Sequence, residues 1–161
     1  MLVINKSGEV KTEYIESDNY IPLNIEFGSW DILEETSIYL RAGNFKSSLI
    51  EFGFGKEGKD LRSITLVLCN KVYYMNSKEI SLENIEWGCP KVNLECKEDC
   101  SIIDEKIDFK VFSGVEGTYI LFSEEKTDIC VRNEQVLFCM NANSELVGVY
   151  IKNVDLKPSK K

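Results

Sequence analysis

The sequence contains no histidine, and this absence removes several classes of active site. Histidine is the usual general base at neutral pH and the commonest protein ligand of zinc. Without it, the Ser-His-Asp and Cys-His catalytic arrangements are excluded. We therefore predict that the protein is not an enzyme. The alternative from this class is an enzyme or small-molecule binder that works through paired carboxylates.

Long apolar runs are also missing. No stretch at the N-terminus reaches the roughly seven apolar residues of a secretory signal. None approaches the roughly 20 residues of a transmembrane helix. The sequence thus predicts a cytoplasmic protein without membrane association, in which the six cysteines are reduced thiols.

Basic residues are too few to balance the acidic ones. The chain has 19 Lys and Arg against 27 Asp and Glu, a net charge of −8. A charge of this sign repels a phosphate backbone, so we predict no nucleic-acid partner and expect a basic protein partner instead. A negative charge also keeps a small domain soluble, and that is the simpler interpretation.

Apolar and polar residues mostly alternate, which is typical of half-buried β-strands. The pattern predicts three hairpins, at residues 2–15 around a turn at 5–8, at residues 48–68, and at residues 134–151. Further strands are predicted at residues 22–27, 37–40, 71–75, 107–112, 118–122 and 128–132. About ten short strands are too many for one flat sheet, so we predict an all-β, mainly antiparallel sandwich or partly open barrel. At most two short helical turns are expected, at residues 29–35 and 81–87.

The length of 161 residues suits a single domain spanning residues 1–161. The segments "LRSITLVLCNKV" and "ELVGVYIKNV" resemble each other, which allows two similar β halves joined near residues 88–105. Residues 157–161 are predicted to form a frayed tail.

Half of the net negative charge lies in residues 95–108. As an exposed loop, this stretch would attract a basic partner and speed association. The two tryptophans lie in segments predicted as connections and could anchor an interface. The predicted partner-binding residues are Trp30, Asp31, Trp87, Glu95, Glu98, Asp99, Asp104, Glu105 and Asp108. The alternative is a solvated loop, with tryptophans that cover the open end of the β core.

Three cysteines, Cys89, Cys96 and Cys100, lie within thirteen residues. Their spacing does not match the paired Cys-x2-Cys pattern of zinc sites, and the nearby acids lack the spacing of a calcium loop. We predict no metal and no cofactor. Cys96 and Cys100 could form a disulfide, and the other interpretation is that the thiols only pack.

Two segments resemble known kinds of bacterial protein. Residues 117–154, "GTYILFSEEKTDICVRNEQVLFCMNANSELVGVYIKNV", are similar to short uncharacterised bacterial β-hairpin modules. Residues 50–74, "IEFGFGKEGKDLRSITLVLCNKVYY", resemble segments of small acidic toxin-immunity proteins of the polymorphic or contact-dependent inhibition type. The resemblance implies a cytosolic immunity protein that binds a toxin domain and blocks it by stoichiometric occlusion. It assigns no functional residue. A self-assembling or structural β protein, whose exposed edges pair with copies of itself, is the alternative.

Overall fold

A computed structural model of the chain describes residues 2–18, 20–29, 38–55, 60–76, 84–92, 94 and 101–156. Within these residues the fold is all-β, with strands β1 to β15 and no helix. The strands form three mostly antiparallel sheets, and none of these closes into a barrel. The predicted all-β fold and its sandwich-like arrangement are therefore confirmed.

The first large sheet has six strands in the order β10-β4-β5-β6-β3-β2. Its strands are β2 (Glu13–Glu16), β3 (Leu23–Phe27), β4 (Ile38–Gly43), β5 (Ser48–Phe54), β6 (Leu61–Cys69) and β10 (Ile102–Lys106). All neighbouring strands are antiparallel except β10, which runs parallel to β4.

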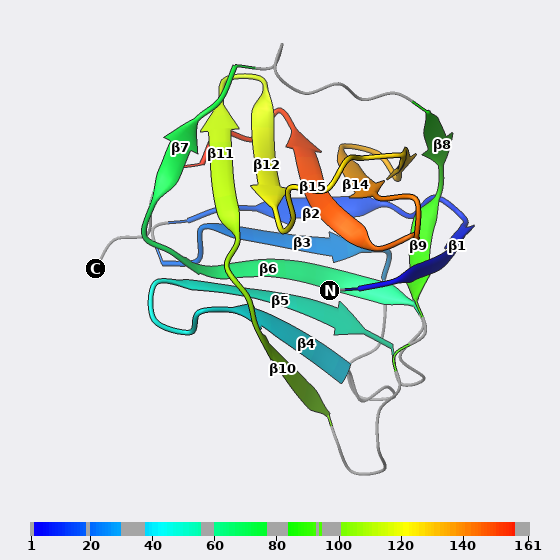
Figure 1. The fold of residues 1–161 in the computed structure, drawn as a ribbon, viewed down its shortest axis with the longest axis horizontal. Coiled ribbons are helices and arrows are strands. Elements are labelled where there is room, and N and C mark those ends of the chain that lie inside the picture. Colours follow the sequence, from blue (N-terminus) through cyan, green and yellow to red (C-terminus); the bar gives the residue numbers. More distant parts are fainter. Residues whose placement is uncertain are drawn as a thin grey trace.

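The second large sheet has seven strands in the order β7-β11-β12-β15-β14-β13-β8. Its strands are β7 (Val72–Tyr74), β8 (Ile85–Trp87), β11 (Lys110–Gly114), β12 (Gly117–Leu121), β13 (Ile129–Arg132), β14 (Val136–Met140) and β15 (Leu146–Lys152). The two short edge strands, β7 and β8, are parallel to their neighbours. Figure 1 shows that strands β11 and β12 cross the direction of β5 and β6 at a steep angle.

Five consecutive strands follow the same path in the two large sheets. The order β2-β3-β6-β5-β4 in the first sheet corresponds to β11-β12-β15-β14-β13 in the second. In both sheets the last strand of this series has a parallel neighbour from elsewhere in the chain, β10 beside β4 and β8 beside β13. The two sheets are thus alike in topology.

The third sheet is an antiparallel pair, β1 (Ile4–Gly8) and β9 (Cys89–Val92), which contacts both large sheets. On one side, the Leu146 N–H at the start of β15 donates to the Leu2 carbonyl at 2.8 Å. On the other side, Lys91 forms a β-bridge with Asp60, the residue before β6. The pair therefore ties together the beginnings of two topologically equivalent strands.

The hydrophobic core lies between the large sheets and contains buried residues of both. Phe27 of β3 and Phe138 of β14 meet with ring centroids 6.0 Å apart. Phe52 of β5 contacts Phe122, just after β12, at 5.9 Å. Alternate residues of β3 and β5 supply the core, because successive side chains of a strand point to opposite faces.

Two of the three predicted hairpins are confirmed, since β5 pairs with β6 and β14 pairs with β15 in antiparallel register. The N-terminal hairpin is wrong. Residues 5–8 belong to strand β1 and not to a turn, and β1 pairs with β9 while β2 pairs with β3. The Asn-Lys-Ser-Gly composition favours a turn locally, but pairing with a distant strand satisfies the same backbone groups.

The structure has more strands than the ten or so expected, because β1, β8, β9 and β10 lack a clear apolar alternation. Residues 85–87, predicted to end a helical turn, form β8. Most of the other predicted helical turn, residues 30–35, and the predicted tail, residues 157–161, lie outside the described residues. In the part of the chain that is described, no helix is long and apolar enough to cross a membrane. The single-domain organisation stays a prediction.

Candidate partner-binding face

The outer face of the six-stranded sheet is polar and partly exposed. In β3, Leu23, Ile25 and Phe27 are buried in the core, so Asn24 and Glu26 point the other way. The same alternation and the strand register place one set of outward residues across all six strands. We call this set the polar face: Tyr14, Glu16, Asn24, Glu26, Tyr39, Arg41, Glu51, Ser63, Thr65, Asp104 and Lys106, with Ile102 as an apolar member at the β10 edge.

Arg41 is the fixed cation of the polar face. Its Nε and Nη2 donate to the two carboxylate oxygens of Asp104 on the neighbouring strand, at 2.7 and 2.9 Å. This fork geometry fits a carboxylate well. The hydrogen bond from Arg41 lowers the pKa of Asp104, and the same bond raises the pKa of Arg41. Glu51 lies opposite Arg41 on the other side and adds to its stabilisation.

The Tyr39 ring can lie across the middle of the polar face because residue 53 is a glycine. Gly53 is its partner on β5, and a Cβ built there would lie 3.2 Å from the Tyr39 ring and 2.3 Å from the Ser63 hydroxyl oxygen. The missing side chain therefore lets the ring lie over the sheet. Nearby, the Thr65 hydroxyl donates to the Asn24 amide oxygen at 2.7 Å, which orders that part of the face.

The polar face has an acidic character. It carries the carboxylates of Glu16, Glu26, Glu51 and Asp104 against two cations, the Arg41 guanidinium and the Lys106 ammonium. A rigid sheet that presents carboxylates and tyrosines is suited to a basic protein surface, because aromatic residues supply contact area and the charges orient the partner.

The predicted binding residues do not form one surface. Asp104 and Glu105 lie in β10, so residues 102–106 are a strand and not part of an acidic loop. Asp104 belongs to the polar face, whereas Glu105 points to the opposite side of the sheet. Figure 1 shows β10 and β8, which carries Trp87, well apart at edges of different sheets.

Trp87 is 61% exposed at the edge of the seven-stranded sheet. The Arg132 guanidinium lies over its ring, 4.7 Å from the centroid. Arg132 thus contributes a cation-π contact to this exposed tryptophan. Trp87 could join an interface of its own, but it does not extend the polar face.

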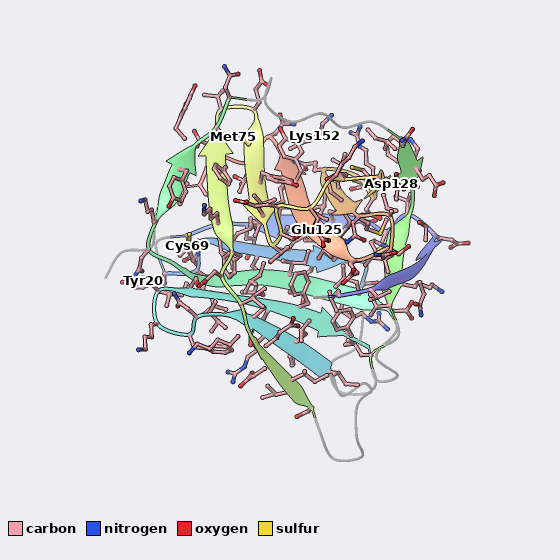
Figure 2. All side chains as sticks on the ribbon, in the orientation of Figure 1. Tyr20, Cys69, Met75, Glu125, Asp128 and Lys152 are labelled. Atoms are coloured by element: carbon pink, nitrogen blue, oxygen red, sulfur yellow. The ribbon has the colours of Figure 1, made fainter. Side chains whose placement is uncertain are left out.

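Asp108 lines a pocket at the end of the sandwich where β6 leads into β7, near Cys69 in Figure 2. The pocket has a volume of about 130 Å³, below the roughly 300–1,000 Å³ of typical ligand sites. Its lining includes Asn70, Lys71, Tyr73 and Lys110, and Asp108 is its single carboxylate. No pair of carboxylates converges in this pocket, so it does not support glycoside-type chemistry.

Several predicted residues lie outside the described part of the chain. They are Trp30, Asp31, Glu95, Cys96, Glu98, Asp99 and Cys100. The predicted disulfide between Cys96 and Cys100 is among them. Of the residues that are described, no group of three or more metal-binding side chains could hold a metal ion.

The four cysteines within the described ranges are buried thiols that are not joined in disulfides. Cys69 and Cys89 are separate thiols, and burial raises the pKa of each, to about 11 for Cys89. Cys130 and Cys139 lie together, with their sulfur atoms 3.2 Å apart. The Cys69 thiol donates to the Lys71 carbonyl at 3.2 Å, and Cys89 is a member of the core cluster. Cys130 and Cys139 form a pair that the sequence interpretation missed.

Comparison with known protein families and with curated proteins finds no match to this sequence. Sequence reasoning also missed most of the polar face, notably Tyr39, Arg41 and Glu51. The available signal was the alternation in the confirmed β5 strand, where Glu51 stands between the core residues Ile50 and Phe52.

Proposed function

We propose that the protein is a binding protein whose polar face covers a basic surface of a protein partner. The observation that carries this proposal is the group of acidic side chains and tyrosines on the outer face of the six-stranded sheet. Backbone pairing on both sides of β4, β5, β6 and β3 holds these side chains in position before a partner arrives. A preformed surface loses little conformational entropy on binding, which favours affinity.

We further propose that this partner is a toxin domain, as the resemblance to small acidic immunity proteins implies. The net charge of −8 favours a basic toxin. Stoichiometric occlusion needs no catalytic group, and a rigid sheet face is sufficient for it. The outer face of the seven-stranded sheet suits this task less, because most of its central residues are buried.

The binding experiment uses the purified full chain and the product of the neighbouring upstream gene. A complex on gel filtration at micromolar concentration is expected. If the two proteins elute separately at that concentration, the toxin-immunity proposal fails. The mass of the chain alone, measured by light scattering, tests the self-assembly alternative, which predicts an oligomer.

Charge reversal identifies the surface used. The double variant Glu26→Lys with Glu51→Lys changes the polar face and should slow association about tenfold or more at low salt. The matched control is Glu116→Lys with Glu124→Lys, two exposed acids on the other sheet's turns, which makes the same change in net charge. Equal on-rates for the two double variants would remove the polar face from the interface.

A further inference from the structure

Cys130 and Cys139 face each other across the antiparallel pair β13–β14, in direct register. Both are almost completely buried, with 0% and 1% of their surface exposed. Their neighbours Val131 and Phe138 point into the core between the sheets, so the two thiols lie on the outer side of the seven-stranded sheet. The sulfur atoms are 3.2 Å apart.

The backbone geometry around the pair suits a disulfide. The Cys130 N–H donates to the Asn84 carbonyl at 3.1 Å, toward β8, and so does not point at β14. Cys130 and Cys139 are therefore a non-hydrogen-bonded pair, the kind in which opposite Cα atoms lie closest, at about 4.5 Å. A disulfide accepts Cα separations of about 4.4–6.8 Å. Small side-chain rotations can bring the sulfurs to bonding distance without moving the strands.

We propose that Cys130 and Cys139 form a redox modification site that a hydroperoxide converts to a disulfide in the folded protein. Hydrogen peroxide is the simplest such oxidant. The sulfur of Cys130, as a thiolate, attacks one peroxide oxygen, the O–O bond breaks, and Cys130 becomes a sulfenic acid with release of one water. The sulfur of Cys139 then attacks the Cys130 sulfur, and the hydroxyl leaves with the Cys139 proton as a second water. Two thiols lose two electrons, and one peroxide gains them.

The surroundings assign the two sulfurs these roles. The hydrogen bond between the two thiols lowers the pKa of Cys130, which favours its thiolate. The same bond and burial raise the pKa of Cys139. Tyr119 lies close to both Cys139 and Thr127, which places the loop after β12 beside the pair. Figure 2 shows Glu125 and Asp128 on this loop, and local opening of such a surface segment can admit a molecule as small as peroxide.

The test is peptide mapping of the folded wild-type protein after treatment with one equivalent of hydrogen peroxide. Trypsin cuts after Arg132, so Cys130 and Cys139 fall in different peptides, and their disulfide appears as one linked species that a thiol reductant separates. We expect this link to be the main product. The same treatment in urea is the control, since without the fold the close pair Cys96 and Cys100 should react instead. A folded protein that keeps both thiols reduced, or links them mainly to other cysteines, overturns the proposal.

A second measurement tests whether the folded protein accommodates the Cys130–Cys139 disulfide. The disulfide closes a short loop, and we expect it to raise the Tm by about 5–10 °C in a chain of this size. The matched control is a variant in which Cys69, Cys89, Cys96 and Cys100 are replaced by alanine, so that only the pair can respond. An oxidised protein whose Tm is unchanged or lower would show that the folded strands do not accommodate the bond, and would overturn the proposal even where the link forms.

Discussion

The two large sheets share a strand order but present different outer faces. In the six-stranded sheet, Arg41 of β4 lies between Asp104 of β10 and Glu51 of β5. In the seven-stranded sheet, Arg132 occupies the corresponding strand, β13, and lies between Trp87 of β8 and Leu137 of β14. One arginine is flanked by acids and the other by apolar side chains. The two sheets therefore share a topology, and the residues that point outward account for the difference between their outer faces.

The two sheets also differ in how deeply their outward-pointing residues are buried. All five residues of β14 are buried, so both of its faces are covered. Its outward residue Leu137 joins Met75 and Tyr150 in a second hydrophobic cluster. On β5, the corresponding strand of the other sheet, outward Glu51 is only half-buried. The comparison indicates that one sheet has a core on both sides, whereas the other leaves one side available for a partner.

Truncation of Leu137 should have the largest effect. Leu137→Ala removes a fully buried side chain from the second cluster and should lower the free energy of unfolding by about 2–5 kcal/mol. Glu51→Ala, at the outward position of the corresponding strand, should change it by no more than about 0.5 kcal/mol. Urea unfolding of both variants measures the difference. Similar effects would mean that the outer faces do not differ in their contribution to stability.

A second contrast lies in the turns that lead into these strands. Asn44 accepts hydrogen bonds from the N–H groups of its own turn, including Ser47 at 2.8 Å. Asn133, in the corresponding turn before β14, instead accepts from the Lys11 N–H at 2.7 Å and donates to the Glu13 carboxylate at 2.8 Å. Asn133 thus fastens the N-terminal segment to the opposite sheet.

Asn133→Ala should therefore lower the free energy of unfolding by about 1–3 kcal/mol, because it removes the hydrogen-bond partner of the part-buried Lys11 N–H and carbonyl. Asn44→Ala should cost about 1 kcal/mol, through its own turn only. Hydrogen exchange distinguishes the two, since only Asn133→Ala should speed exchange at Lys11. Protection of Lys11 that is equal in both variants would contradict the assigned role.

The strand pair that joins the two sheets should make stability depend on alkaline pH. Burial raises the pKa of the Cys89 thiol in β9 to about 11, above its usual value near 9. Because the folded state holds the proton more tightly, this stabilisation is present below pH 9 and is lost as the pH rises through 11. Between these values the wild type should lose up to about 2 kcal/mol more than Cys89→Ala. Parallel pH profiles of the two proteins would exclude Cys89 as the cause.

The sequence was sufficient for the strands whose partners are close along the chain. Alternating Ile50, Phe52 and Ile64 and the polar turn between them predicted β5–β6 correctly, and the same reasoning gave β14–β15. Pairing between distant segments could not be obtained in this way. Residues 5–8 resemble a turn in composition, and only their pairing with β9 makes them a strand.

The candidate site was harder to predict than the fold. Asp104 was selected for its charge, but its role depends on Arg41, which lies 63 residues away and is reached only through the parallel β4–β10 pair. The cysteine pair was closer to prediction. The sequence predicted one strand at residues 128–132 and another beginning at residue 134, and the structure pairs these segments as β13 and β14, with Cys130 opposite Cys139.

Substitutions at the two arginines should change stability least, and they compare the outer faces of the two sheets most directly. Arg41→Ala leaves Asp104 and Glu51, on the two strands that flank β4, without their shared cation, whereas Asp104→Ala leaves Arg41 beside Glu51. Arg41→Ala should therefore lower the Tm more than Asp104→Ala, and both changes should stay within about 4 °C, because exposed ion pairs contribute little. The Tm difference between wild type and Asp104→Ala should also shrink as the pH falls below about 4, and it should vanish once the pH is below the lowered pKa of Asp104, where the carboxyl is protonated in the folded state too.

The salt dependence of the Tm should distinguish the contacts of Arg41 from those of Arg132. The Asp104 carboxylate is exposed, so 1 M salt should remove most of the effect of Arg41→Ala through screening. Arg132 lies against the Trp87 ring at 4.7 Å and donates through Nε to the Glu134 carbonyl at 2.8 Å, contacts that combine cation-π attraction with packing. The Tm change of Arg132→Ala should therefore persist in 1 M salt. Equal salt dependence in the two variants would show that the charged and the apolar surroundings of these arginines are energetically equivalent, against the contrast between the sheets.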